Sequence, residues 1–392
     1  MGSALTLLAG LDPAGLPQQL VNGVLLGGIY ALLALGYTMV YGVLRLINFA
    51  HGEVFMLGAY TSLFVSWALG FSPEAMKSGS HQSNPMNLVI MILVSMTVCA
   101  LVGVVIELFA YRPMRGSSRI ASLITAIGVS LLLQYGGQLF LPTSPPPSIS
   151  DKVNPYSGSW EIPLKSADAS LVAALAKART EAKESQAEID RQHINRFDTN
   201  LPPAQAALIT TVETSERQVH DLEAKINNSS VKINLRYGQL IMLGSTIVLM
   251  LLLRHLVLKT PIGRAMRAVS HDFDSASLMG VNVNQIVTLT FMIGSALAGA
   301  GAMMYATLGD SPALNTFYGS LPGVKAFVAA VLGGIGNIPG AVLGGLLMGV
   351  AENLVVWAGY SQYKDAVAFV ILIAVLLLKP GGIMGSSKVE KV

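Results

Sequence analysis

Long apolar runs separated by short polar segments dominate the pattern of the chain. A helix needs about 20 apolar residues to cross a bilayer, and the runs that approach this length are 18–43, 54–70, 87–110, 120–141, 238–258, 285–307 and 364–379. The apolar region 325–356 differs, because the sequence Gly-Gly-Ile-Gly-Asn-Ile-Pro-Gly at 333–340 divides it into two half-length pieces. Such an interruption favours a re-entrant hairpin or a broken pair of helices over one continuous span. The pattern predicts an all-α fold, a polytopic membrane helical bundle with broken or re-entrant helices.

Residues 142–237 have a different character, since they begin with a proline-rich stretch and then become polar and charged. Small or apolar residues recur there at alternating spacings of four and three, in Leu171–Ile189 and in Leu208–Ile226, on either side of Pro202-Pro203. This heptad pattern predicts an inserted extramembrane helical hairpin, an antiparallel coiled coil. The insertion separates an N-terminal transmembrane part, 1–141, from a C-terminal transmembrane part, 238–392. A solvated insertion without any role in transport is the alternative.

The distribution of Lys and Arg predicts the orientation of the chain in the membrane. No Lys or Arg precedes Arg45, whereas the loops after the third and fifth runs are rich in them. The basic residues of these two loops are Arg112, Arg115, Arg119, Arg254, Lys259, Arg264 and Arg267. We therefore expect both loops and the C-terminal tail to be cytosolic, and the N-terminus and the insertion to be extracytoplasmic.

The composition agrees with a membrane protein, because 52% of the residues are hydrophobic and only 12% are charged, against about 25% charged in soluble domains. The formal net charge is +3, and no basic patch interleaved with aromatic residues predicts nucleic-acid binding. Cys99 is the only cysteine, so neither an intrachain disulfide nor a thiolate metal site is expected. The sequence contains no nucleotide-binding loop of the Gly-x-x-x-x-Gly-Lys-Ser/Thr type and no catalytic constellation. We expect no enzyme activity, cofactor or metal in this chain.

Polar and ionisable residues lie next to or inside the apolar runs, notably in the segment Ile-Asn-Phe-Ala-His-Gly-Glu at 47–53. An ionisable group at membrane depth costs about 2.5–3.5 kcal/mol and often marks a transport path. The candidate path residues are Asn48, His51, Glu53, Glu352 and Asn353. Glu107, Gln134 and Gln138 also lie in apolar runs. For all these residues, hydrogen bonding between helices or snorkelling to the membrane surface is the alternative role.

The predicted cytosolic loop 259–282 carries a second functional signal. Pro261 is suited to the first turn of a helix, and small residues alternate with basic ones after it. A short helix of this kind, lying flat under the membrane, suits docking into a groove of a soluble partner. The candidate docking residues are Arg264, Arg267, His271, Asp272 and Gly280. An ordinary charged loop that obeys the positive-inside rule is the alternative.

Several long motifs in a fixed order resemble the LivH-type permease subunits of branched-chain amino acid ABC importers. They are Leu-Val-Asn-Gly at 20–23, Tyr-Ala-Leu at 30–32, Gly-Tyr-Thr-Met-Val-Tyr-Gly at 36–42, the 47–53 segment, the 263–282 loop, and Val-Leu-Gly-Gly-Ile-Gly-Asn-Ile-Pro-Gly-Ala at 331–341. The resemblance covers roughly 17–141 and 238–383. The 142–237 insertion is the departure, since typical members lack it.

The resemblance implies a multi-pass permease of the bacterial inner membrane. Its expected partners are membrane lipid, a second permease subunit, two cytosolic ATPase subunits that use the ATP, and an extracytoplasmic substrate-binding protein. The 263–282 loop would be the ATPase-docking loop, with Gly280 at the family's glycine position. A urea or short-amide importer of the same family remains an alternative. So does a stand-alone secondary transporter or channel, in which His51 and Glu53 would be proton-coupling or filter groups, although such a protein has no need of the cytosolic loop.

Overall fold

The computed structural model describes residues 15–71, 85–115, 117–142, 158–165, 169–191, 202–229, 231–308 and 314–385. The chain divides into two compact units. Unit 1 comprises Met1–Gln18 and Trp160–Leu235, and unit 2 comprises Gln19–Ser159 and Arg236–Val392. We describe each unit separately.

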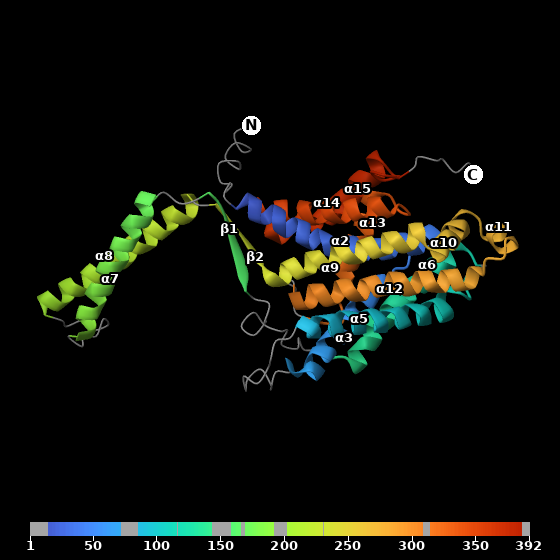
Figure 1. Cartoon of the computed structure of the whole chain (residues 1–392), viewed down its shortest axis with the longest axis horizontal. Helices are drawn as coiled ribbons and strands as arrows, with labels where there is room; N and C mark the ends of the chain where they lie inside the picture. The colour runs from blue at the N-terminus through green and yellow to red at the C-terminus, as the bar shows by residue number, and fades with distance from the viewer. Residues whose placement is uncertain are drawn as a thin grey trace. The chain divides into compact units, whose positions relative to one another are not determined.

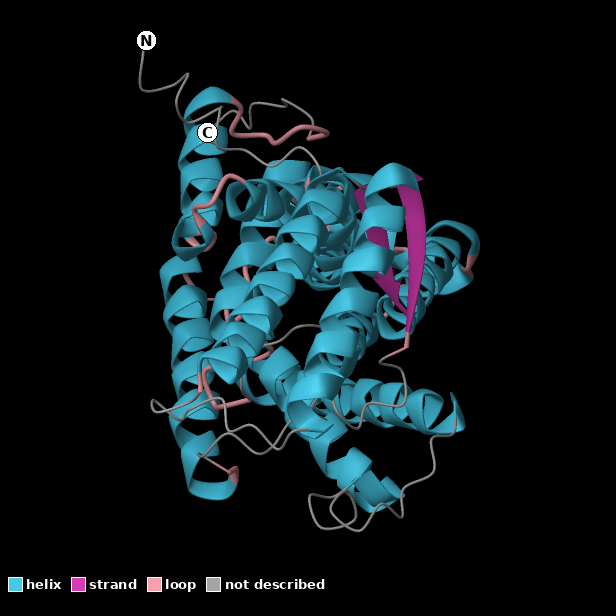
Figure 2. Ribbon diagram, turned by 90° about the vertical axis from the view of Figure 1, so that its left-hand side faces the viewer, coloured by secondary structure: helices cyan, strands magenta, loops and turns pink. Residues whose placement is uncertain are grey.

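Unit 2 is a bundle of helices (Figures 1 and 2). Its longer helices are α2 (Leu16–Leu44), α3 (His51–Ser66) continued by η1 (Trp67–Phe71), α5 (Pro85–Ile106) continued by η2 (Glu107–Tyr111), α6 (Arg119–Phe140), α9 (Tyr237–Lys259), α12 (Val283–Leu308) and α14 (Ile338–Trp357). The shorter ones are α10 (Pro261–His271), α11 (Phe273–Leu278), α13 (Ser320–Gly333), η3 (Ser361–Tyr363) and α15 (Ala366–Leu378). Within the described residues, 7 helices are long and apolar enough to cross a membrane.

The set of long helices differs from the predicted one at the C-terminal end. The run 364–379 forms α15, which has 13 residues and reaches only about 20 Å at roughly 1.5 Å per residue. The seventh long helix is instead α14, with 20 residues, which begins within the glycine-rich interruption, at Ile338. Hydropathy overestimated α15 because Lys364 and Asp365, at the start of the run, lie before the helix.

Helix α2 lies at the centre of unit 2, where 89% of its apolar window is buried. Glycines allow α14 to approach it closely: a Cβ on Gly27 would lie 2.7 Å from Leu346 Cα, and one on Gly345 would lie 2.5 Å from Ala31 Cα. Small residues at such crossings are typical of membrane helices, since lipid provides no hydrophobic force to bring helices together.

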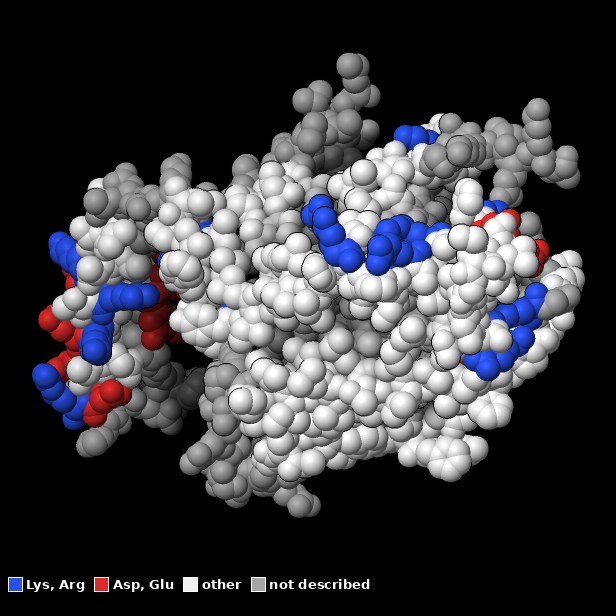
Figure 3. Space-filling view, turned by 45° about the vertical axis from the view of Figure 1, so that its right-hand side comes forward, with Lys and Arg blue, Asp and Glu red and all other residues white. Residues whose placement is uncertain are grey.

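Helices α3, α5 and α12 pack along one another in the other half of unit 2. The Ser95 hydroxyl of α5 lies 2.9 Å from the carbonyl oxygens of both Gly58 and Gly299. Cys99 is also fully buried in this packing. Figure 3 shows that the visible face of unit 2 carries few charged side chains, as a lipid-facing surface requires.

Unit 1 contains two helices, α7 (Ala169–Arg191) and α8 (Pro203–Ser229), and two strands, β1 (Ser159–Lys165) and β2 (Val231–Arg236). The helices pack against each other, with Ile189 buried beside Val212 and Arg179 Nη2 2.7 Å from Glu223 Oε1. Acidic and basic side chains are interspersed on this surface (Figure 3). The strands pair in a two-stranded sheet, which corrects the all-α prediction, because each strand is too short for its alternating pattern to stand out from polar loop sequence.

Candidate functional site

Two cavities lie at opposite ends of the helix pair α2 and α9. The cavity that we name the Lys325 cavity has a volume of about 720 Å³ and is lined by the Asn22–Tyr30 part of α2 and by Gln239 and Met242 near the start of α9. The Arg45 cavity has a volume of about 990 Å³ and is lined by the Thr38–Arg45 part of α2 and by Val257 and Leu258 near the end of α9. Between them, the Ala31–Tyr37 segment of α2 is fully packed. The arrangement is that of two vestibules closed in the middle.

The Lys325 cavity contains a cluster of buried charges. Lys325 Nζ, on α13, lies 2.8 Å from Glu352 Oε1 on α14 and 2.6 Å from Asp365 Oδ1 just before α15. The Tyr30 hydroxyl of α2 donates to Glu352 Oε2 over 3.1 Å. One cation and two carboxylates from three separate elements therefore meet at the cavity wall. Sequence reasoning missed Lys325 and Asp365, although an ionisable residue inside or beside an apolar run is itself a signal.

The Arg45 cavity is bordered by the interruption between α13 and α14. Gly334 and Gly336 have φ values of +104° and +89°, a left-handed conformation that glycine adopts without strain. Asn337 then caps α14, because its Oδ1 accepts a hydrogen bond from Gly340 N over 3.0 Å, and Pro339 lies in the first turn. Arg45, directly after α2, is the one described non-glycine residue with a positive φ, at 54°. This end of the cavity is therefore built from irregular backbone.

The five predicted path residues fall into two groups. Glu352 and Asn353 line the Lys325 cavity. Asn48, His51 and Glu53 are buried among the helices, at exposures of 2%, 1% and 3%, and line neither of the two cavities. Of the second group, His51 contacts the middle of α2, whereas Asn48 and Glu53 bond to Tyr111 and Gln134.

Each member of this second group has a specific neighbour. Asn48 Oδ1 accepts from the Tyr111 hydroxyl over 2.9 Å, and Glu53 Oε1 accepts from Gln134 Nε2 over 2.5 Å. The His51 ring packs edge-on against Tyr37, with ring centroids 4.6 Å apart. It also lies so close to Gly36 that a Cβ there would be 2.5 Å from His51 Cε1. His51 therefore contacts the α2 segment that separates the two cavities.

The predicted docking loop forms α10 and α11, as Figure 1 shows. Thr260 caps α10 by accepting from Gly263 N over 3.1 Å. Met266 and Val269 are buried on one face of α10, whereas Arg264 and His271 are exposed on the other. Arg267 donates to the Val257 carbonyl of α9, which ties the loop to the bundle.

Asp272 stands between the two short helices as the N-cap of α11. Its carboxylate accepts from Ser275 Oγ over 2.8 Å, from Ser275 N over 3.1 Å and from Asp274 N over 2.9 Å. These hydrogen bonds, the one from Ser275 Oγ first, hold the pKa of Asp272 below its usual range. After α11, Gly280 has a φ of +83°, so a side chain at this position would be strained.

The end of α11 presents two exposed apolar side chains of the predicted docking loop. Leu278 is 89% exposed and Met279 is 85% exposed. Neighbouring apolar side chains at the tip of a polar loop are typical of an interaction site. Their degree of exposure could not be read from the sequence.

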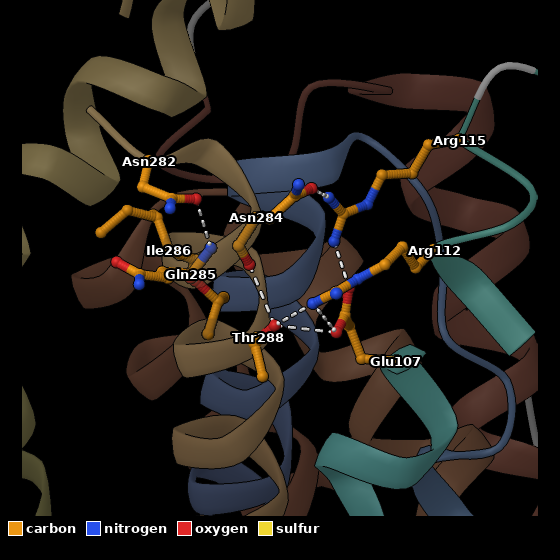
Figure 4. Close-up of polar contacts among 9 residues, drawn as sticks. Glu107, Arg112, Arg115, Asn282, Asn284, Gln285, Ile286 and Thr288 are labelled. Carbon is orange, nitrogen blue, oxygen red and sulfur yellow. Dashed lines mark hydrogen bonds and ion pairs between the residues drawn. The ribbon is translucent and has the colours of Figure 1, made fainter. Parts of the chain in front are cut away.

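A third polar group, which we name the Glu107 joint, connects the loop to the bundle (Figure 4). Glu107, at the end of α5, is fully buried and forms ion pairs with Arg112 and Arg115. Arg112 Nη2 also donates to Thr288 Oγ1 over 2.9 Å, and Arg115 Nη1 donates to Asn284 Oδ1 over 2.5 Å. Thr288 and Asn284 belong to the first turns of α12, which starts directly after the docking loop. The joint therefore fixes the end of α5 to the beginning of α12.

Among the described residues, no group of three or more His, Cys, Asp or Glu side chains could hold a metal ion. The ionisable groups described above lie instead at the wall of the Lys325 cavity, at the contact of His51 with α2, and in the loop that forms α10 and α11.

Comparison with known proteins places the chain among membrane permeases. The family described as branched-chain amino acid transport system / permease component matches residues 19–376. The chain is 35% identical to the high-affinity branched-chain amino acid transport system permease protein BraD of Pseudomonas aeruginosa, over 96% of this chain and 97% of that protein. It is also 35% identical to LivH of Escherichia coli, a permease protein of the same description, with the same coverage. No solved structure matches the chain.

Proposed function

The chain belongs to the permease component family of branched-chain amino acid transport systems, and from this premise we propose that it carries leucine, isoleucine and valine into the cell. Members of the family are multi-pass membrane permeases of ATP-driven transporters and not enzymes. The observation that carries the proposal is the family match over residues 19–376. This range includes the Lys325 cavity, all lining residues of the Arg45 cavity except Met384 and Gly385, the helix crossing at His51 and the predicted docking loop.

The substrate path runs from the Lys325 cavity to the Arg45 cavity along α2. Glu352 and Asn353 belong to its first half, and Asn48, His51 and Glu53 control its middle. The position of His51 against Gly36 and Tyr37 supports this role, because any opening of the packed α2 segment must change that contact. Opening one cavity while the other stays closed would expose the path to each side in turn.

Two cytosolic ATPase subunits dock on α10 and α11 and drive this change. Arg264, Arg267, His271 and Asp272 orient the loop, Gly280 provides its last turn, and Leu278 and Met279 insert into a groove of the ATPase. A few residues buried at the centre of an interface often carry most of its binding energy. Movement of the loop passes to α12 directly and to α5 through the Glu107 joint.

The remaining partners follow from the orientation of the bundle. The basic residues at the loop ends support a cytosolic position for the Arg45 cavity. The Lys325 cavity then opens outward, where a substrate-binding protein delivers its cargo. A second permease subunit completes the membrane part. Helices α13 and α15, both shorter than a bilayer requires, act as broken or re-entrant elements. Residues 142–237 form an extracytoplasmic helical hairpin on the side where the binding protein lands.

Uptake measurements test the proposed function. The chain is expressed with the permease, ATPase and binding-protein subunits encoded beside it, in cells that lack their own uptake of branched-chain amino acids. We expect uptake of radiolabelled leucine, competition by isoleucine and valine, and no competition by urea or acetamide. Omission of the ATPases should abolish uptake. Uptake of urea without leucine would assign the amide substrates instead, and uptake by this chain alone would make it a stand-alone carrier or channel.

A further inference from the structure

The charges around Lys325 face an open cavity instead of being sealed in the protein interior. The Lys325 and Glu352 side chains are only 7% and 3% exposed, whereas the Asp365 side chain is 42% exposed. A purely structural ion cluster is stable only when its members are fully paired and hydrogen-bonded. Here one carboxylate stays accessible to whatever fills the cavity.

The ammonium group of Lys325 also retains hydrogen-bonding capacity. An ammonium has three N–H donors. Lys325 Nζ donates to Asp365 Oδ1 over 2.6 Å and forms an ion pair with Glu352 Oε1 over 2.8 Å. Its other contact among the described residues is the Tyr30 hydroxyl at 3.5 Å, which is close to the limit of a hydrogen bond. A better acceptor entering the cavity would therefore gain a charge-assisted bond from Lys325.

Apolar side chains form one part of the remaining cavity wall, beside the polar Asn22, Gln239, Asn315, Asn353 and Lys364. Leu25, Leu26 and Ile29 of α2, Met242 of α9 and Val356 of α14 line the same space as the charges. Its volume of about 720 Å³ lies in the range of roughly 300–1,000 Å³ that is typical of small-molecule sites. The cavity thus combines an acceptor for a cation, a donor for an anion and an apolar wall.

We infer that the Lys325 cavity is a binding site within the permease for a zwitterionic α-amino acid with a branched apolar side chain. The ligand's ammonium lies against the accessible carboxylate of Asp365, and its carboxylate takes the third N–H of Lys325. The side chain packs against Leu25, Leu26 and Ile29. An uncharged amide cannot form the two ionic contacts. This inference deepens the proposed function and rests on it.

The order of contacts also suggests what the site does in transport. Glu352 and Tyr30 bind Lys325 from the side of α2 and α14, whereas Asp365 binds it from the start of α15. A ligand that draws Asp365 and Lys325 onto its own charges loosens the bond between α13 and α15. Binding of a ligand in the Lys325 cavity would therefore change the packing of α13 against α15.

Direct binding of radiolabelled leucine tests the site. The complete permease–ATPase complex is placed in lipid nanodiscs without its binding protein, so that binding by the permease alone is measured. We expect Asp365→Asn to raise the half-saturating leucine concentration about tenfold or more, equivalent to about 1.4 kcal/mol. The matched control is Asp190→Asn, a change of the same kind at an exposed position of α7, which should leave binding unaltered.

A second variant tests the apolar wall independently of the charges. Leu26→Trp fills part of the cavity and should weaken leucine binding more than alanine binding. Unfolding midpoints measured for every variant separate loss of the site from loss of the fold. In parallel, 4-methylpentanoate and isoamylamine, which each lack one of the two charges of leucine, should compete at least about tenfold less well than leucine.

The outcomes distinguish failure of the inferred binding site from failure of the proposed function. If the complete complex takes up leucine but the permease alone binds none, or if Asp365→Asn binds it as the parent does, the site is wrong and the proposed function stands. If the complete complex takes up no branched-chain amino acid, both are wrong. Equal competition by leucine and 4-methylpentanoate would overturn the role of Asp365.

Discussion

The two ends of unit 2 each contain a buried ion cluster, but the clusters are built differently. In the Glu107 joint a buried carboxylate is held by two arginines, and the arginines bond to Thr288 and Asn284 as well. In the Lys325 cavity a buried cation is held by two carboxylates, one of them 42% exposed. The arginines of the first cluster join two helices, while the second cluster lies at the wall of a cavity, where we propose that a ligand binds. What the charges border, more than the charges themselves, separates the structural joint from the proposed binding site.

The largest effect should come from breaking the docking end at its most exposed apolar residue. Leu278→Asp places a charge where we propose an apolar contact with the ATPase, and loss of a central contact costs about 2 kcal/mol or more, roughly 30-fold in affinity. We expect copurification of the ATPases and leucine uptake to fall together, with leucine binding at the Lys325 cavity unchanged.

The thermal stability of the permease should not change in Leu278→Asp, since the Leu278 side chain is 89% exposed. Ala268→Glu, on the exposed face of α10, should act in the same direction. If uptake falls while the ATPases stay bound and fully stimulated, the docking assignment is wrong.

Removal of the central charge of the Glu107 joint should produce the next largest effect. Glu107→Ala leaves two arginines without their common partner, and breaking a buried pair typically costs about 3–5 kcal/mol. The side chain of Arg112 is 39% exposed and can turn to solvent, so we expect the lower part of that range. The measurement is the unfolding midpoint in detergent, with the exposed Glu184→Ala of α7 as the matched control. An unfolding midpoint equal to that of the control would show that the Glu107 joint does not stabilise the fold.

Replacement of the insertion should affect only the association of the binding protein. Exchange of 165–230 for a short Gly-Ser linker removes α7 and α8, and if they guide the binding protein, the rate of its association falls by roughly a few-fold. Leucine binding by the permease alone should be unaltered. Unchanged uptake and unchanged binding-protein affinity would leave the insertion without a part in transport.

The side of the membrane on which the insertion lies can be tested separately. The only native cysteine, Cys99, is fully buried, so Glu184→Cys gives a clean labelling site on α7. Labelling by an impermeant maleimide in intact cells is expected. Labelling only after lysis would reverse the orientation.

The smallest effect concerns the cap between α10 and α11. Because its pKa is lowered in the folded chain, the Asp272 carboxylate stabilises α11 at all pH values above its unfolded pKa of about 4. That contribution is lost as the pH falls from there through the folded pKa. Hydrogen exchange at the Asp274 and Ser275 amides should therefore speed up only in acid. Asp272→Asn, which keeps a capping oxygen, should abolish the pH response, and Asp272→Ala should speed exchange at every pH. If the Asp274 and Ser275 amides of Asp272→Ala exchange as slowly as those of the parent, the Asp272 cap does not stabilise α11.

Hydropathy and charge located the long helices and the docking loop, because both depend on residues close together in the sequence. They placed α10 correctly from Pro261 and the basic face that follows it. They located α15 but overestimated its length. They did not identify α14 as a full-length helix, because nothing local in the split region 325–356 indicates which half is long enough to cross the bilayer. The strands β1 and β2 were missed because they pair over a separation of about 70 residues, too far for any local pattern.

The candidate site was predicted only in part for the same reason. Glu352 was noticed as a charge within an apolar region, but its partner Lys325 lies on another helix, and the pairing depends on how α13, α14 and α15 pack. Exposure is equally non-local: nothing in the loop sequence distinguishes Leu278 from the buried Val269. The role of His51 and Glu53 in the path remains a prediction, which Glu53→Ala tests by a strong loss of uptake at normal expression and stability.

The central claim is that ATP hydrolysed at the docking end moves an amino acid admitted at the cavity end. Its most direct test is leucine accumulation in proteoliposomes that contain the complete complex, with binding protein and leucine on the side of the Lys325 cavity. We predict accumulation only when ATP is present on the side of α10 and α11, at a rate that a protonophore does not change. Accumulation that proceeds without ATP and collapses with the protonophore would contradict the account and identify a stand-alone carrier.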